Sequence, residues 1–283
     1  MLRIAVPNKG TLSVPAAQML REAGYRQRTD AKDLICSDAE NEVVFFYLRP
    51  RDIATYVGSG DLDLGITGRD LMIDADSGAE ELLDLDFGAA TFRYAARPGT
   101  LDDLPADLAG RRVATAYPGV VTRHLAEHGV QAQVVKLDGA VENAIRLGVA
   151  DVIADVVETG STLRQAGLTA VGEPILRSSA VLIRRVGAAT DSPRVTQLQR
   201  RLQGVLVARR YVLLAYDVRT DQVDAATAVT PGIESPTISP LRREGWVAVQ
   251  AMVQRGEVHR IMDELYDLGA RAILVTDIHA CRL

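Results

Sequence analysis

Short apolar strands alternate with helices along the first two thirds of the chain, and this alternation restricts the possible folds more than any other feature. Apolar runs at residues 43–48, 112–116 and 133–137 each end in a polar turn that opens a helix. Such alternation predicts an α/β fold, in which parallel strands form a sheet with helices on both faces. Ligands bind at the carboxyl ends of strands in these sheets, so functional residues are expected there.

The charge and composition of the chain exclude several classes of partner. The net charge is −5 and no basic cluster is present, whereas binding to a nucleic-acid backbone needs clustered Lys and Arg. No apolar run approaches the length of a membrane span, and Met1 leads directly into an apolar strand rather than a signal peptide. We therefore expect a cytoplasmic protein that binds neither nucleic acid nor membrane, with Cys36 and Cys281 as reduced thiols.

The stretch from residue 152 to residue 163 is the most informative about a ligand. Its first three residues indicate the end of a buried strand, and residues 159–162 indicate a tight loop that opens a helix at Leu163. Glycine and small hydroxyl residues let backbone N–H groups approach an anion, and a helix amino terminus adds unpaired donors. Asp155 and Glu158 suit ribose hydroxyls, or a Mg²⁺ carried by a pyrophosphate. The stretch predicts a sugar-phosphate or phosphoribosyl ligand, although an ordinary strand, turn and capped helix remains the alternative.

Charged residues also follow three earlier strands. Lys9 lies in the turn after the first strand, Arg49 ends the strand at residues 43–48, and Asp70 opens a helix after the next strand. We expect the three to lie along one edge of one sheet. Lys9 and Arg49 suit anionic groups, and Asp70 suits a ligand amino group or hydroxyl. A solvated loop lysine and a helix-cap carboxylate are the alternatives for Lys9 and Asp70.

The pattern changes after residue 210. Strands are expected near residues 211–216, 246–253 and 271–275, with helices near residues 220–229 and 257–268. Two helices against about four strands predict a small ferredoxin-like βαββαβ domain, of the kind that often binds a regulatory ligand. The residues between the first helix and the second strand, 230–237, are expected to form a loop.

Five motifs in this order resemble the ATP phosphoribosyltransferases, which catalyse the first step of histidine biosynthesis. They are Val6-Pro7-Asn8-Lys9-Gly10, Leu48-Arg49-Pro50, and residues 63–68, 114–118 and 155–163. Residues 230–237 resemble the tail domain of the long form of the family. Each motif alone is weak, but the resemblance covers essentially the whole chain and keeps the expected order.

The resemblance implies a fold and an assembly. The catalytic part would be two α/β lobes of periplasmic-binding-protein type, joined by two crossing segments, with the active site between them. Lobe I would comprise residues 1–90 and 181–210, and lobe II residues 91–180. Residues 211–283 would form a regulatory domain that binds histidine as feedback inhibitor. Homodimers would assemble into homohexamers.

The resemblance also assigns roles to individual residues. The phosphoribosyl pyrophosphate loop would be Asp155, Val156, Val157, Glu158, Thr159, Gly160, Ser161 and Thr162. The nucleotide-binding residues would be Arg49, Asp70, Leu71 and Tyr117. Lys9 and Glu142 match further active-site positions, and Asp155 and Glu158 would also act in catalysis. The histidine pocket would be Asp217, Ile233, Ser235, Thr237 and Ala272. Asp217 has an alternative role as the cap of the helix that begins near Thr220.

The implied reaction is displacement at C1 of phosphoribosyl pyrophosphate by N1 of the ATP adenine. Pyrophosphate would leave as its Mg²⁺ complex, with no protein ligands to the metal predicted. Catalysis would rest on positioning and charge stabilisation. A two-lobed effector-sensing or solute-binding protein without catalysis is the main alternative. A phosphoribosyltransferase for another base is disfavoured, because Asp155 and Glu158 are not adjacent as that class requires.

Overall fold

The computed structural model describes residues 1–157, 160–188 and 192–282. The chain forms two compact units. The larger contains residues 1–21 and 25–195, and the smaller contains residues 22–24 and 196–283. Across the described ranges, no helix combines the length and the apolar character needed to cross a membrane.

The larger unit contains two sheets, of which the first has six strands in the order β2-β3-β1-β4-β11-β5. These are β1 (Leu2–Pro7), β2 (Ile35–Asp38), β3 (Val43–Leu48), β4 (Leu64–Gly68), β5 (Ala79–Asp84) and β11 (Ala180–Arg185). The central strands β3, β1 and β4 are parallel, whereas β2 pairs antiparallel with β3 and β11 pairs antiparallel with both β4 and β5. The three parallel strands therefore end at the same edge of this sheet.

Each of these parallel strands leads into a helix. The helices are α1 (Ser13–Glu22), α2 (Pro50–Gly58) and α3 (Arg69–Ala75). Ile53 and Val57 of α2 are fully buried in the core on one face of the sheet. Gly65 on β4 allows this close packing, because a Cβ there would lie 2.5 Å from Cγ2 of Ile53. The absence of a side chain at Gly65 thus lets α2 pack closely against β4.

The second sheet has five strands in the order β10-β6-β9-β7-β8. They are β6 (Ala90–Ala96), β7 (Arg112–Thr115), β8 (Gln133–Lys136), β9 (Val152–Val157) and β10 (Thr169–Ser178). The predicted parallel arrangement is correct for β7, β8 and β9 but wrong for β6, which is antiparallel to both β9 and β10. The reason is that β6 enters this sheet at the edge where β9 ends, since Thr91 pairs with Val157.

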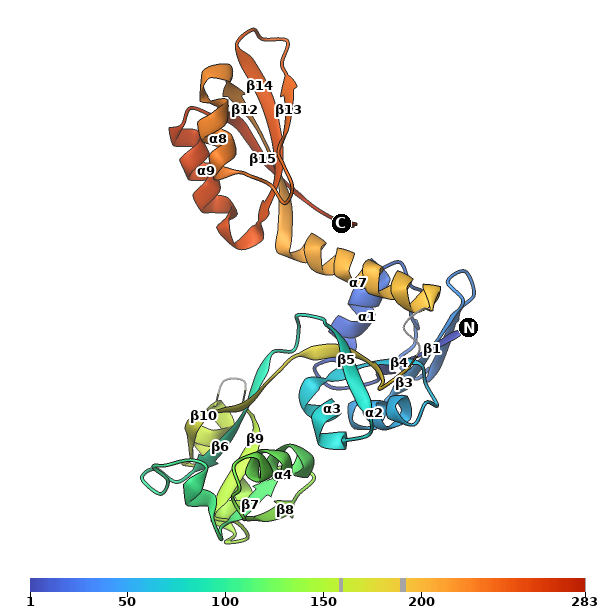
Figure 1. Ribbon diagram of the computed structural model, residues 1–283, viewed down its shortest axis with the longest axis vertical. Coiled ribbons are helices and arrows are strands. Elements are labelled where there is room, and N and C mark those ends of the chain that lie inside the picture. Colours follow the sequence, from blue (N-terminus) through green and yellow to red (C-terminus); the bar gives the residue numbers. More distant parts are fainter. Residues whose placement is uncertain (158–159, 189–191, 283) are drawn as a thin grey trace. The chain divides into compact units, whose positions relative to one another are not determined.

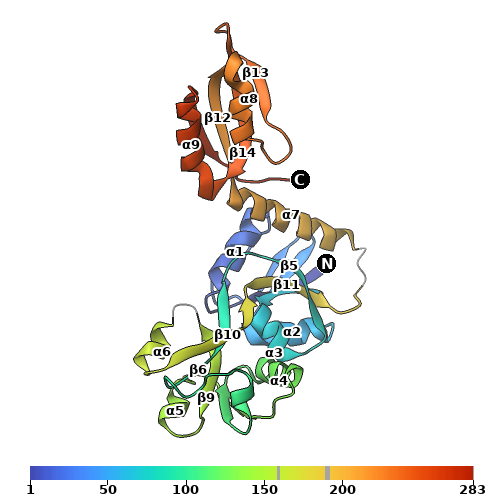
Figure 2. The same cartoon turned by 60° about the vertical axis from the view of Figure 1, so that its left-hand side comes forward.

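Helices cover both faces of the second sheet, as the sequence predicts. They are α4 (Pro118–Glu127), α5 (Asn143–Arg146) and α6 (Ser161–Gln165), with a 3₁₀ turn η1 (Ala106–Leu108). Val121 and Leu125 of α4 pack in the core on one face. Ile145 of α5 and Leu163 of α6 pack in the core on the other face, and Figure 2 shows these two helices beside β6 and β9.

Two segments connect the sheets. Residues 85–89 link β5 to β6, and Ser179 alone separates β10 from β11 (Figure 1). This is the two-lobed α/β architecture with two crossings that the resemblance implies, and that prediction is confirmed. Below, lobe I means the six-stranded sheet with its helices and lobe II means the five-stranded sheet with its helices. The residue ranges proposed for the lobes stay a prediction.

The smaller unit begins in α7 (Pro193–Arg210), most of which belongs to it, and continues as a ferredoxin-like βαββαβ fold, as predicted. Its elements are β12 (Tyr211–Arg219), η2 (Thr220–Gln222), α8 (Val223–Val229), β13 (Thr237–Pro240), β14 (Trp246–Gln254), η3 (Arg255–Glu257), α9 (Val258–Asp267) and β15 (Arg271–Asp277). The strand order is β13-β14-β12-β15 and all pairs are antiparallel. The strand β13 starts at Thr237, at the end of the stretch expected to be a loop.

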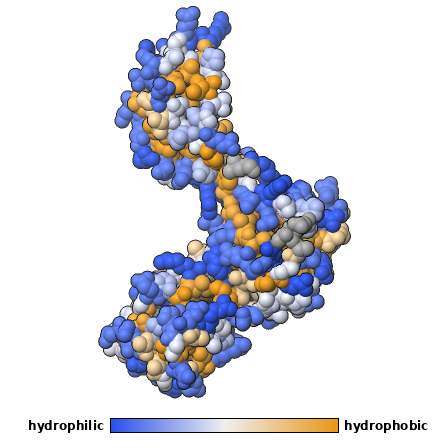
Figure 3. Space-filling model, viewed as in Figure 1, coloured by the Kyte–Doolittle hydropathy of each residue, from blue (hydrophilic) through white to orange (hydrophobic). Residues whose placement is uncertain are grey.

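One face of this sheet is buried under α8 and α9. Leu214 and Tyr216 of β12 share a core with Ile261 and Leu265 of α9. Leu274 pairs with Ala215, whose side chain points away from that core, and Leu274 is 63% exposed. Apolar atoms are correspondingly visible on the surface of the smaller unit in Figure 3.

Candidate active site

The predicted alignment of Lys9, Arg49 and Asp70 along one sheet edge is confirmed. β1, β3 and β4 are neighbours in the sheet and run parallel, so the residues that follow them lie at the same edge. Lys9 and Arg49 are exposed, and Arg49 immediately precedes α2. Asp70, in the first turn of α3, is only 8% exposed. The two cations are therefore accessible at this edge, while the carboxylate is set into it.

Hydrogen bonds hold Asp70 in place. Ser178 Oγ donates to Asp70 Oδ1 at 2.8 Å and accepts from the Asp70 backbone N–H at 3.1 Å. Gly68 gives the carboxylate room, because a Cβ at this position would lie 2.2 Å from Asp70 Oδ1. The cap residue of α3 is Gly68, which has no side chain, and Asp70 is the acidic residue of the first helical turn. This position is compatible with the alternative role of Asp70 as a cap-region carboxylate, which is favourable beside a helix amino terminus.

Lobe II contributes Tyr117 at the carboxyl end of β7. Its ring meets Phe92 edge to face, with the centroids 5.3 Å apart. The guanidinium of Arg51 lies 4.5 Å from the centroid of the Tyr117 ring and donates to the carbonyl of Ala116 at 2.8 Å. Burial raises the pKa of Tyr117 and the negative charge of Asp70 raises it further. The phenol therefore stays protonated at neutral pH and can donate a hydrogen bond.

A cavity of about 160 Å³ brings these groups together. Residues of both lobes line it, including Lys9, Asp70, Leu71, Tyr117, Val156 and Ser178. Three of the four predicted nucleotide-binding residues are thus in one place. The fourth, Arg49, precedes Pro50, which also lines the cavity. The arrangement offers a buried carboxylate, a phenol and a cation around a small apolar space.

The stretch after residue 152 differs from its prediction in two ways. The strand β9 extends to Val157, so Asp155, Val156 and Val157 lie on a strand rather than in a loop, because they pair with β6. The helix begins at Ser161 rather than at Leu163, since Gly160 turns the chain in a left-handed conformation with φ of 68°. Ser161 and Thr162 therefore lie in the first helical turn. Glu158 and Thr159 lie outside the described residues.

A second cavity, of about 280 Å³, lies at this turn. It is lined by six residues of the predicted phosphoribosyl pyrophosphate loop, Asp155, Val156, Val157, Gly160, Ser161 and Thr162, and by the predicted catalytic residue Glu142, together with Ile153 and Leu163. Val156 lines this cavity and the first one. The two cavities are therefore neighbours.

Asp155 is the half-buried carboxylate of the second cavity. Burial raises its pKa, and the charge of Glu142 raises it further, whereas the backbone N–H of Val156, which donates to Asp155 Oδ1 at 2.8 Å, lowers it. Arg51 also lowers this pKa. The opposing contributions leave the pKa of Asp155 above its ordinary value, so the protein does not fully compensate the carboxylate, and hydroxyl or cationic groups of a ligand could do so.

Two residues at these cavities were missed by sequence analysis. Arg51 reaches from α2 of lobe I to the end of β7 in lobe II, and a cation two residues after Arg49 was a usable signal. Ser178 comes from β10, a strand that the sequence pattern did not predict. A lone serine before Ser179 carries no recognisable motif, so only the structure connects it to Asp70.

The five residues predicted for a histidine pocket lie in the smaller unit. Asp217 pairs with Arg271 across β12 and β15, next to a register shift at which Ala272 has a positive φ of 50°. Thr237 opens β13, with β14 between it and β12. Ile233 and Ser235 lie in the preceding loop. Asp217 and Ala272 are thus close together, whereas β14 separates Thr237 from them in the sheet.

The capping role for Asp217 is wrong. Asp217 lies inside β12, two residues before the strand ends. The residue at the cap of η2 is Arg219, and that at the cap of α8 is Gln222, and neither makes a side-chain cap hydrogen bond. The carboxylate is therefore not used to start the following helix.

Comparison with known proteins decides the family. The family profile described as ATP phosphoribosyltransferase matches residues 49–204, which is more than half of the chain. The chain belongs to the ATP phosphoribosyltransferase family. A second profile, described as the HisG C-terminal domain, matches residues 208–280. An ATP phosphoribosyltransferase of Salinispora tropica is 71% identical over the whole of both chains, and one of Streptomyces avermitilis is 65% identical over the whole of both.

Solved structures add a likeness in fold. The ATP phosphoribosyl transferase (HisG:HisZ) complex from Thermotoga maritima contains a chain with a TM-score of 0.62 and 24% sequence identity. The match covers 73% of this chain and 98% of that one. At this identity the match supports the fold, and membership of the ATP phosphoribosyltransferases rests on the sequence matches.

Proposed function

We propose that this chain transfers the phosphoribosyl group of phosphoribosyl pyrophosphate to N1 of ATP and releases pyrophosphate, as the first step of histidine biosynthesis. The observation that carries the proposal is the pair of neighbouring cavities that share Val156. One has a glycine turn, hydroxyls and carboxylates suited to a sugar phosphate. The other offers a buried carboxylate and a phenol suited to a purine. A transfer between two substrates needs such adjacent sites.

The cavity at the glycine turn would hold phosphoribosyl pyrophosphate. Gly160 leaves its surroundings open to a phosphate, and the hydroxyls of Ser161 and Thr162 would donate to it. Asp155 would accept from the ribose hydroxyls and favour the positive charge that develops on the sugar ring. We assign Glu158 to the same task on sequence alone. Glu142, which lines the cavity and raises the pKa of Asp155, would add negative potential.

The cavity between the lobes would hold the nucleotide. Asp70 would accept a hydrogen bond from the ligand, and Tyr117 would donate one. Leu71, which is 9% exposed, would supply an apolar contact to the base. Lys9 and Arg49 would pair with anionic groups at the exposed rim. This assignment uses every residue predicted for the nucleotide from both lobes.

The chemistry needs little acid–base help from the protein. The lone pair on N1 of adenine forms the new bond to C1 of the ribose, and the bond from C1 to the pyrophosphate oxygen breaks with its electron pair. The residues of the two cavities would align N1, C1 and the leaving oxygen and exclude water. Asp155 would stabilise the transient positive charge without exchanging a proton.

We assign Mg²⁺ as the cofactor. Within the described ranges, no three His, Cys, Asp or Glu side chains gather as metal ligands. We expect Mg²⁺ to keep its waters and to bind chiefly to the substrate phosphates. The carboxylates of Asp155 and Glu142 line the phosphoribosyl pyrophosphate cavity and are the oxygen groups that could approach the metal there. When bound, Mg²⁺ would neutralise the leaving pyrophosphate.

The remaining parts of the proposal concern regulation, assembly and location. Histidine would bind to the smaller unit at Asp217, Ile233, Ser235, Thr237 and Ala272 and inhibit. Homodimers would assemble into homohexamers, which is supported by exposed apolar residues of the smaller unit such as Leu274 and Ile238, the latter 48% exposed. The protein would act in the cytoplasm. Light scattering with and without histidine tests the assembly.

One assay tests the central proposal. Protein, ATP, Mg²⁺ and phosphoribosyl pyrophosphate are mixed, and the ultraviolet change that accompanies N1-ribosylation of adenine is followed. Product that appears only when both substrates are present supports the transferase. Binding of either substrate without any product would instead favour an effector-sensing protein of the same fold.

A further inference from the structure

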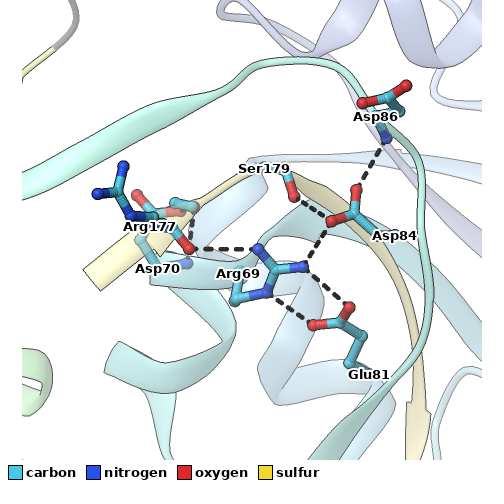
Figure 4. A network of polar contacts seen from close by, with 8 residues as sticks. Arg69, Asp70, Glu81, Asp84, Asp86, Arg177 and Ser179 are labelled. Atoms are coloured by element: carbon cyan, nitrogen blue, oxygen red, sulfur yellow. Dashed lines mark hydrogen bonds and ion pairs between the residues drawn. The ribbon is translucent and has the colours of Figure 1, made fainter.

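A network of polar contacts lies where the two lobes are connected, with Arg69 at its centre (Figure 4). The guanidinium donates to both carboxylate oxygens of Glu81, at 2.8 and 2.9 Å. It also donates to Asp84 Oδ2 at 2.8 Å and to the backbone carbonyl of Arg177 at 3.2 Å. The backbone N–H of Arg69 donates to the carbonyl of Ser179 at 3.0 Å. Arg69 thus binds two separate parts of the chain, the strand β5 and residues 177–179.

Those parts include both connections between the lobes. Asp84 ends β5, just before the first crossing segment, and Asp86 of that segment donates its backbone N–H to Asp84 Oδ1 at 2.8 Å. Ser179 is the second crossing itself, and its Oγ donates to Asp84 Oδ2 at 2.9 Å. The two connections are therefore tied to each other and to Arg69, as Figure 4 shows.

The network adjoins the nucleotide cavity through two neighbours in sequence. Arg69 directly precedes Asp70, and Ser178 lies between Arg177 and Ser179. Ser178 Oγ donates to the Asp70 carboxylate at 2.8 Å and accepts from its backbone N–H at 3.1 Å. The carboxylate and the backbone N–H of Asp70 are thus both bound by the last residue of β10, next to the second crossing. Arg69 is not among the residues that line the cavity.

We propose that Arg69 and Ser178 are positioning residues, which set the Asp70 carboxylate for the nucleotide by holding the start of α3 against both lobe connections. The inference rests on the proposed function, because that function assigns Asp70 to ATP. The proposal gives the polar network around Arg69 a role in binding ATP in addition to a role in stability.

The charges at the junction explain why Arg69 is needed there. Its side chain is 22% exposed, between carboxylates that are 31% exposed at Glu81 and 48% exposed at Asp84. Burial alone would raise the pKa of Asp84, but the hydrogen bonds from Arg69 and Ser179 hold it below the usual value. Without Arg69, two like charges would face each other beside the second crossing, and the start of α3 would lose its anchors.

Kinetics of two variants test the proposal. In Arg69→Gln and in Ser178→Ala we expect KM for ATP to rise about tenfold, as expected for one lost hydrogen bond to a charged group. KM for phosphoribosyl pyrophosphate should stay within about twofold, since Asp155 and the glycine turn are untouched. Arg69→Lys, which keeps the charge but not the fork, should recover part of the ATP effect.

Arg112 offers a matched control. Its guanidinium also binds both oxygens of one carboxylate, Asp151, at 3.2 and 2.8 Å, and donates to a backbone carbonyl, that of Gly148, at 2.8 Å. Arg112 begins β7, at the end of the strand opposite to Tyr117. Arg112→Gln should lower the melting temperature as Arg69→Gln does, with both KM values unchanged. Equal kinetic effects in the two variants would overturn the proposal.

The outcomes also separate this inference from the proposed function. If the wild-type protein forms no N1-ribosylated product, the proposed function itself fails. If the wild type is active but both variants keep its KM for ATP, only the positioning role fails. If Arg69→Gln does not fold, Ser178→Ala decides alone, because it removes a single hydroxyl.

Discussion

The cavity beside Asp70 and the cavity beside Asp155 are neighbours, yet different parts of the structure hold their ligand groups. In the first, side chains from distant segments fix each other: Ser178 holds Asp70, and Arg51 covers Tyr117. In the second, the local backbone positions the ligand groups, through the end of β9 and the left-handed turn at Gly160. Asp155 itself is held by the N–H of the next residue.

This difference predicts how ligand binding at each cavity should depend on substitutions. A site built from distant side chains is sensitive to substitutions that are far away in sequence, and it depends on how the lobes meet. A site built from one local turn is sensitive to few positions, but strongly, because a single backbone conformation determines it. The predictions below test this contrast.

The largest effect is expected at Gly160. Its φ of 68° disfavours any other residue, and a Cβ would lie 3.4 Å from Nη1 of Arg164 and 3.8 Å from Cγ1 of Val157. Gly160→Val should therefore disturb the turn and crowd the phosphate, raising KM for phosphoribosyl pyrophosphate by about a hundredfold, equivalent to roughly 3 kcal/mol. Steady-state kinetics measures this. A normal KM would remove the turn from the proposed site.

Gly129 provides the control for backbone strain. It has a φ of 66° and a Cβ there would meet nothing within 4 Å. Gly129→Val should therefore lower stability by about 1–2 kcal/mol, the cost of a left-handed side chain, while KM stays normal. Thermal unfolding of both variants separates the loss of binding from the loss of stability.

The second effect is on turnover. If Asp155 acts on the developing positive charge, Asp155→Asn should lower kcat by about 10²-fold, the size found for one preorganised electrostatic group, with a smaller change in KM. Asp151→Asn changes a carboxylate that precedes β9, at the opposite end from the cavity and in an ion pair with Arg112, and it should leave kcat unchanged. Equal turnover in wild type and Asp155→Asn would make Asp155 a structural carboxylate.

The pH dependence follows from the same residue. Burial and Glu142 raise the pKa of Asp155, so its folded-state pKa lies above its unfolded value. The stability that this group contributes is then present below the unfolded pKa and is lost as pH rises through the folded pKa. At neutral pH, Asp155→Asn should thus not lower the melting temperature. Activity should fall as pH falls through the raised pKa, and the variant should lack that acid limb.

The third effect tests the contact between lobes. Arg51→Met removes the cation 4.5 Å from the Tyr117 ring and the hydrogen bond to Ala116. These contacts are worth together about 2 kcal/mol, so KM for ATP should rise about thirtyfold. Arg243→Met is the matched control, since Arg243 lies 4.7 Å from the ring of Trp246 in the smaller unit. Only the Arg51 variant should change ATP binding.

The contrast between the cavities also explains what the sequence could predict. Residues at the ends of regular parallel strands, such as Lys9 and Arg49, were found because apolar runs mark where a strand stops, whereas Tyr117 was assigned through the family resemblance. The strands β5 and β10 were not predicted, because charges interrupt the first and Gly172 and Pro174 the second. Because β10 was not predicted, Ser178 had no predicted position in the fold. The hydrogen bond from Ser178 to Asp70 could therefore not be predicted. The strand β6 was expected near residues 92–97, but its antiparallel direction was not, since only the path of the chain between the lobes reverses it.

The smallest effect on the uninhibited reaction is expected at Asp217. Asp217 lies within β12 beside the irregular pairing at Ala272 and caps no helix, and its proposed role is to bind histidine. Asp217→Ala should abolish inhibition by histidine and leave kcat without histidine within about twofold, because the two sites lie in separate units. Asp221→Ala, which breaks only an exposed pair with Arg219, should keep inhibition. Inhibition constants for both variants decide the question, and full inhibition of Asp217→Ala would place the histidine site elsewhere in the chain.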